Sequence, residues 1–84
     1  LTIETVSMQL FPNPTNAQLN IILDNSDNNV NAMIFDLNGR ITWTGELNAG
    51  SSQVDVAGLA PGMYYLQIVT NDGQRLTQKF IKSE

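Results

Sequence analysis

The chain has 84 residues, no cysteine, no histidine and a formal net charge of −4, and these features argue against several classes of function. Without cysteine it has neither disulfides nor thiolate chemistry, and without histidine it lacks the usual general base at neutral pH and the commonest metal ligand. Only four Lys and Arg residues are present, so the clustered cations that bind nucleic-acid phosphates are missing and no nucleic-acid partner is predicted.

Alternating apolar residues predict two strands at the start of the chain, at residues 3–11 and 18–24. Pro12 and Pro14 lie between them and end the first strand, because proline cannot donate to a strand ladder. The residues predicted to point inward are Val6, Met8, Leu10, Leu19, Ile21 and Leu23.

Residues 24–29 form a polar loop whose side-chain oxygens invite comparison with a calcium site. The loop lacks the glycine and the distal glutamate of a helix-loop-helix calcium site. A solvated loop is therefore the favoured interpretation, and no metal or cofactor is predicted.

Residues 30–37 and 40–47 are predicted to pair as a hairpin, because Asn38-Gly39 between them is a strong signal for a type I′ turn. Apolar residues on both faces of the first strand favour a position in the middle of a sheet. In the second, Ile41, Trp43, Gly45 and Leu47 share one face. Trp43 could be an exposed platform for sugar rings, but this shared parity favours a position in the core.

Three further strands are predicted at residues 53–56, 62–70 and 75–82, the last two joined by a tight turn over residues 71–74. Val54 and Val56 are expected to point inward. Seven short strands with frequent turns and no helical periodicity predict an all-β fold, an immunoglobulin-like seven-stranded antiparallel β-sandwich.

Tyr64 is predicted to form a tyrosine corner at the start of the sixth strand. In immunoglobulin-like sandwiches such a tyrosine hydrogen-bonds to backbone upstream and fixes the crossing between sheets. The preceding Leu59, Pro61 and Gly62 provide the spacing and the turn that this role needs.

Catalysis is hard to assemble from these residues, and the chain is predicted not to be an enzyme. Serine and threonine hydroxyls need a base, and Lys79 and Lys82 have no obvious buried partner. Asp36 and Asp55 could in principle pair for glycoside chemistry, but chance proximity explains such a pair better. No catalytic residue is therefore predicted.

The last strand is distinctive because it is basic on an otherwise acidic chain. Arg75, Lys79 and Lys82 accompany one acidic residue from position 75 onward, whereas Arg40 is the only basic residue before it. The lysines could protect an edge strand from aggregation, or the strand could bind a partner or a second copy by strand addition. The residues alone do not separate these alternatives.

Four segments resemble the type A C-terminal sorting domain of the bacterial type IX secretion system. They are Leu10-Phe11-Pro12-Asn13-Pro14, Phe35-Asp36-Leu37-Asn38-Gly39-Arg40, Leu59-Ala60-Pro61-Gly62-Met63-Tyr64-Tyr65-Leu66 and Lys79-Phe80-Ile81-Lys82. On this resemblance the fold-defining residues are Pro12, Pro14, Gly39, Leu59, Pro61, Gly62 and Tyr64, and the chain is one sorting domain, residues 1–84, cut from a larger secreted protein.

The resemblance implies a signal rather than an activity. The folded domain would be recognised in the periplasm, direct an N-terminal cargo domain through the outer-membrane translocon, and be removed by a sortase-like peptidase at the cell surface. Within the last strand, Lys79, Phe80, Ile81 and Lys82 would form the recognition segment. The protein is then expected in the periplasm in transit, and afterwards at the outer membrane, on the cell surface or outside the cell.

Two other functions remain open at this stage. A carbohydrate-binding or adhesion module would need an exposed aromatic patch, for example Trp43 with Tyr65. A structural spacer attached to a larger enzyme would need only the fold.

Overall fold

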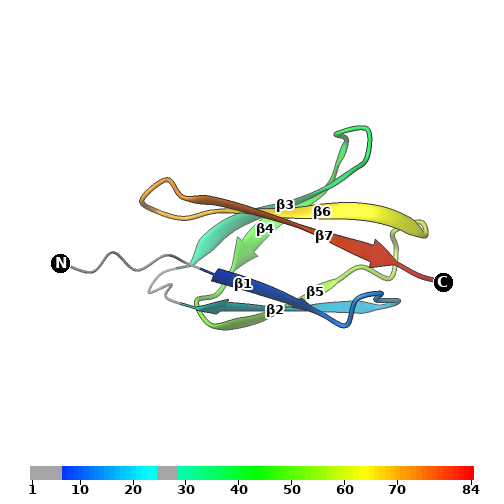
Figure 1. Cartoon of the computed structure of the whole chain (residues 1–84), viewed down its shortest axis with the longest axis horizontal. Coiled ribbons are helices and arrows are strands. Elements are labelled where there is room, and N and C mark those ends of the chain that lie inside the picture. The colour runs from blue at the N-terminus through cyan, green and yellow to red at the C-terminus, as the bar shows by residue number, and fades with distance from the viewer. Residues whose placement is uncertain (1–6, 25–28) are drawn as a thin grey trace.

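The computed structural model describes residues 7–24 and 29–84, and this part of the chain folds as two layers of antiparallel strands (Figure 1). The predicted strand over residues 3–11 is described only from Ser7 onward. The strands are β1 (Ser7–Phe11), β2 (Gln18–Asp24), β3 (Val30–Asp36), β4 (Ile41–Leu47), β5 (Ser51–Asp55), β6 (Gly62–Val69) and β7 (Arg75–Lys82).

The two layers are a three-stranded sheet in the order β1-β2-β5 and a four-stranded sheet in the order β4-β3-β6-β7. All strand neighbours within each sheet are antiparallel. This arrangement confirms the predicted seven-stranded sandwich, and β3 does lie inside its sheet, between β4 and β6.

The core lies between the sheets and is built from every second residue of the strands, because successive side chains of a strand point to opposite faces. Six core side chains have no solvent exposure: Leu19, Ile21, Ile34, Leu66, Ile68 and Phe80. The inward positions predicted for Leu10, Leu23, Val54 and Val56 are also confirmed. Burial of this apolar surface is the main force that holds the two sheets together.

Two hairpin loops share one backbone arrangement, which at Asn38-Gly39 differs from the predicted two-residue turn. In each, three residues separate a bonded pair: the Asp36 N–H donates to Arg40 (3.0 Å) and the Thr70 N–H donates to Gln74 (2.9 Å). Gly39 and Gly73 occupy the third loop position with φ of 84° and 89°, a conformation that favours glycine. The Asn38-Gly39 hairpin is therefore confirmed, with a longer loop.

A β-bulge interrupts the pairing of β3 with β4 near the hairpin loop. The register shifts between Ile34 and Phe35, so that Ile34 pairs with Trp43 while Phe35 pairs with Ile41. The extra residue, Thr42, donates its hydroxyl to the Ile34 carbonyl oxygen (3.1 Å). The prediction that Ile41 shares the face of Trp43 is wrong, because the bulge turns Ile41 to the other face, where it is 55% exposed.

Among residues 7–24 and 29–84, no helix is long and apolar enough to cross a membrane.

Candidate functional site

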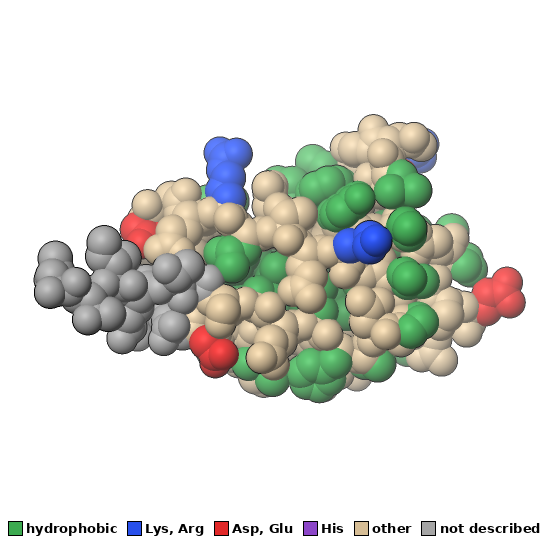
Figure 2. Space-filling model, in the orientation of Figure 1, with side chains coloured by type: hydrophobic (Ala, Val, Ile, Leu, Met, Phe, Trp, Pro, Cys, Tyr) green, Lys and Arg blue, Asp and Glu red, His purple; other side chains and the backbone are tan. Residues whose placement is uncertain are grey.

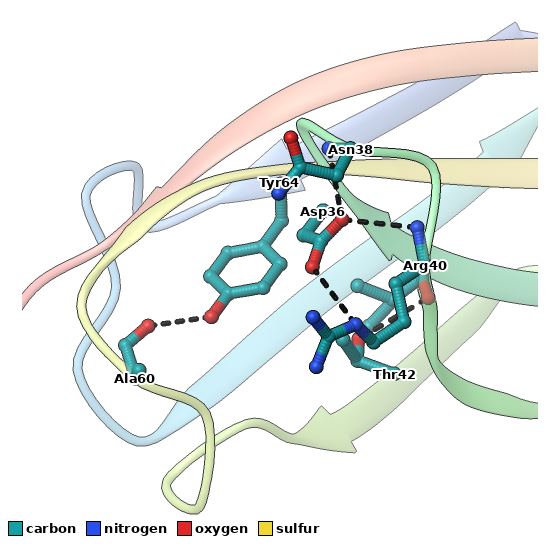
Figure 3. Close-up of polar contacts among 7 residues, drawn as sticks. Asp36, Asn38, Arg40, Thr42, Ala60 and Tyr64 are labelled. Carbon is teal, nitrogen blue, oxygen red and sulfur yellow. Dashed lines mark hydrogen bonds and ion pairs between the residues drawn. The ribbon is translucent and has the colours of Figure 1, made fainter.

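Tyr64 forms the predicted tyrosine corner at the start of β6. Its hydroxyl donates a hydrogen bond to the Ala60 carbonyl oxygen at 2.6 Å (Figure 3). The side chain is only 7% exposed, and its ring stacks on that of Phe80 with a centroid distance of 5.7 Å. The corner therefore connects the crossing loop, β6 and β7 in one contact.

The loop before Tyr64 is held from both ends. The Leu59 N–H donates to the Val56 carbonyl oxygen (3.0 Å), and Leu59 packs against the core. Gly62, with φ of 153°, begins β6 directly after Pro61. Leu59 thus ties the loop to the core, and that Leu59 and Gly62 define the fold stays a prediction.

The end of β7 is bonded to the segment between β1 and β2, a contact that the sequence reasoning missed. Thr15 donates its N–H to Ile81 (2.9 Å) and accepts the N–H of Ser83 (2.7 Å) through its own carbonyl oxygen. The Ile81 N–H donates to the Asn13 side chain at 2.9 Å. We call this set of bonds among Asn13, Thr15, Ile81 and Ser83 the Thr15 bridge.

Thr15 itself is 1% exposed, and its hydroxyl donates to the Gln18 carbonyl oxygen at 2.6 Å. The segment with Pro12 and Pro14 does more than end β1, because the residue that follows it, Thr15, is bonded to the last strand. The burial of a threonine in an otherwise polar connection gives no signal in a single sequence.

The four residues of the predicted recognition segment separate into two pairs. Lys79 is exposed and Ile81 is 40% exposed, on the outer face of the sheet. Phe80 is fully buried and Lys82 is 5% exposed, with its ammonium donating to the Ser83 carbonyl oxygen at 2.7 Å. Of the two alternatives left open for the lysines, protection of an exposed edge does not apply to Lys82, because this side chain is buried and the Thr15 bridge covers that end of β7.

The two carboxylates considered for catalysis in the sequence accept hydrogen bonds from the backbone of their own turns. Asp36 accepts the N–H groups of Asn38 (2.9 Å) and Arg40 (3.0 Å), and its second oxygen lies 3.8 Å from the Arg40 guanidinium (Figure 3). Asp55 accepts the N–H of Ala57 at 2.9 Å. Both residues therefore stabilise turns, as Asn and Asp commonly do.

Asp72 lies in the β6–β7 loop and accepts hydrogen bonds from residues of its own turn. Hydrogen bonds from the Thr70 hydroxyl, and then from Gln74, hold the pKa of Asp72 below its ordinary value of 3.8. This network closes the β6–β7 loop, and Asp72 within it is exposed to solvent.

No group of three or more potential metal ligands is found in the described part of the chain. Most of the polar loop considered for calcium, residues 25–28, lies outside the described residues.

Trp43 and Tyr65 do not form a common aromatic patch. Trp43 is half-buried, packs against the core and lies over Gly45, as its predicted core position requires. Tyr65 stacks on Phe35 on the other face of the sheet, with ring centroids 5.6 Å apart. The sugar-binding surface that an adhesion module would need is therefore not formed by this pair.

The family model described as "Secretion system C-terminal sorting domain" matches residues 9–83. The match covers both the proline segment and the last strand, which the Thr15 bridge joins. The chain belongs to this family.

A solved structure resembles this sorting domain across nearly the whole chain. It is a DUF3244 family protein with an immunoglobulin-like β-sandwich fold from Bacteroides vulgatus, with a TM-score of 0.71 and 17% sequence identity over 93% of this chain and 96% of that chain. At this identity the likeness concerns the fold. No curated protein matches the sequence.

Family membership identifies the chain as a C-terminal sorting signal of type IX secretion. Such a signal implies interaction with the secretion machinery and export toward the outer membrane or cell surface. The family also suggests a non-catalytic role.

Proposed function

We propose that the folded sandwich is read in the periplasm by the outer-membrane translocon, which then exports a cargo domain attached at the N-terminal side. A sortase-like peptidase removes the domain at the cell surface, and the cargo remains there or is released. The single observation that carries the proposal is the family match over residues 9–83. The absence of histidine and cysteine is compatible with it, because a passive signal needs no reactive side chain.

Within this function, we assign direct recognition to the exposed half of the terminal segment, Lys79 and Ile81. Their side chains reach solvent, whereas Phe80 and Lys82 are buried. A partner that docks on the folded domain can contact only side chains that it reaches without unfolding. Phe80 and Lys82 then act by holding β7 in place.

The test is a fusion of these 84 residues to a periplasmically exported fluorescent protein, in a bacterium with an intact type IX system and in a strain without the translocon. We expect fluorescence outside the cell only in the first strain. Retention of the fusion in the periplasm, with the sandwich shown to be folded by limited proteolysis, would contradict the proposal.

A further inference from the structure

The outer face of the four-stranded sheet carries an apolar band that crosses all four strands. Lys79, Tyr65, Phe35 and Ile41 follow one another in direct cross-strand register, from β7 through β6 and β3 to β4. Met63 and Ile81 form the neighbouring pair on β6 and β7. We call the six residues Phe35, Ile41, Met63, Tyr65, Lys79 and Ile81 the sheet-face band.

The apolar members of this band are open to solvent. Ile41 is 55% exposed, Ile81 40% and Met63 38%, and the stacked rings of Phe35 and Tyr65 are half-buried between them. Single exposed apolar residues are ordinary on protein surfaces, but a contiguous group marks a contact site. Figure 2 shows hydrophobic side chains gathered on the surface in the right half of the view.

The sheet-face band carries a positive charge, on Lys79, whereas the chain as a whole is negative. Among the described residues the single ion pair joins Arg40 to Asp36, and Lys79 has no acidic partner. The acidic residue on the same face of the sheet is Glu46, two register rows away on β4, in the row that also contains Arg75. A cation at the end of an apolar row, on a chain of net charge −4, favours a partner with carboxylates at the matching position.

The free edge of β7 is partly covered, so the outer face of the sheet is a better docking surface than this edge. Ile81 directs its backbone groups away from β6 and bonds them to Asn13 and Thr15. Next to the sheet-face band, only Thr77 and Lys79 have backbone groups that point away from β6 and have no partner among the described residues. This is a short stretch for strand addition, whereas the band extends over four strands.

We propose that the sheet-face band docks onto an apolar protein surface of the export machinery that is flanked by carboxylates facing Lys79. This inference rests on the sorting function proposed above and assigns that function to a particular surface. A protein surface fits better than an anionic membrane, because membrane binding through charge uses clusters of four or more Lys and Arg, and this band holds one lysine. Aromatic residues and methionine are also enriched where proteins meet.

The test uses the fluorescent fusion with two substitutions in the band and two matched controls. Lys79→Glu reverses the charge within the band, and Arg75→Glu makes the same change on the same face of β7 outside it. Ile41→Ser removes an exposed apolar side chain from the band, and Phe11→Ser does so on β1, where Phe11 is 44% exposed. Denaturation midpoints of the four purified domains show that each is folded.

We expect Lys79→Glu and Ile41→Ser to lower export about tenfold, the effect of losing one contributing contact residue of an interface. Arg75→Glu and Phe11→Ser retain export near that of the unchanged fusion. A photo-crosslinking residue at Met63 forms adducts with a protein whose crosslinked surface carries carboxylates, whereas the same residue at exposed Gln53 on β5 does not.

Three outcomes would overturn the inference. Normal export of both band variants, in cells that export the unchanged fusion, would remove the band from recognition and leave the sorting function intact. Crosslinks to lipid, together with Lys79-dependent sedimentation on phosphatidylglycerol vesicles, would make the band a membrane contact. Failure of the unchanged fusion to leave the periplasm would remove the sorting function and the docking surface together.

Discussion

The hydroxyl of Tyr64 donates to the carbonyl oxygen of Ala60, four residues upstream, at 2.6 Å. Tyr64→Phe removes this bond and leaves the ring in place, so we expect the free energy of unfolding to fall by about 1–2 kcal/mol. Tyr65→Phe is the matched control, because the structure gives the Tyr65 hydroxyl no partner among the described residues. Equal urea midpoints for the two variants would contradict the tyrosine corner.

Thr15→Val tests the side-chain hydrogen bond that holds Thr15 within the segment between β1 and β2. The substitution keeps the side-chain shape but removes the hydroxyl that donates to Gln18, and so leaves a part-buried carbonyl oxygen unpaired. We expect a loss of about 1–3 kcal/mol in the free energy of unfolding. Thr44→Val, at an exposed position of β4, is the control and is expected to change the urea midpoint little. If both variants unfold at the same urea concentration, the hydroxyl of Thr15 contributes nothing.

Gly45→Ala is expected to displace the indole of Trp43. An added Cβ would lie 2.6 Å from Cζ2 of the Trp43 ring, too close for two carbons, so the ring must move. We expect a cost of about 1–3 kcal/mol, typical of overpacking, and a red shift of the single tryptophan's fluorescence. At Gly58, where no atom lies within 4 Å of the added Cβ, the same substitution serves as a control with an unchanged spectrum. An unshifted spectrum for Gly45→Ala would contradict this packing.

The two lysines of β7 are expected to differ in their effect on stability. Lys82→Ala removes a buried side chain and its bond to Ser83, and we expect it to lower the free energy of unfolding by about 1–2 kcal/mol. Lys79→Ala, at an exposed position, is expected to change it by less than about 0.5 kcal/mol. Chemical denaturation of the two variants measures this difference. An unchanged free energy of unfolding for Lys82→Ala would show that burial of this side chain adds no stability.

The carboxyl of Asp72 predicts a pH dependence of defined sign. Its pKa is lower in the folded chain than the ordinary 3.8, so its contribution to stability is present above that pH and is lost as the pH falls through the folded pKa. We expect Asp72→Asn to be less stable than the unchanged chain at pH 6 and to approach it in acid. Thr70→Val, which removes the main donor, is expected to raise the pKa of Asp72 in an NMR titration. A pKa unaffected by this change would contradict the assigned cause.

Much of the fold could be predicted because its strands obey local rules. The sequence placed β2 and β7 at their observed bounds, since turn residues frame both strands and every second residue of β2 is apolar. Tyr64 was predicted from the Leu-x-Pro-Gly spacing before it, and its bond to Ala60 lies within five residues of chain. Interactions over such short separations leave a pattern in sequence.

What the sequence could not predict depends on long-range register. The bulge at Thr42 reverses the face of Ile41, and nothing in an alternating pattern marks where a residue is skipped. The burial of Lys82 depends on Thr15, far away in the chain, and a single sequence records no such pairing. The sheet-face band was missed for the same reason, because it exists only when four strands lie side by side.

The Thr15 bridge joins residues 68 positions apart, and this separation sets the order in which the domain can be completed. Protein chains are synthesised from the N-terminus, so Asn13 and Thr15 emerge long before Ile81 and Ser83 can meet them. β6 is already complete at that point, but the end of β7 stays uncovered until Ile81 and Ser83 are available to bond with Asn13 and Thr15. A product truncated before Ile81 would therefore lack the Thr15 bridge and the covered end of β7.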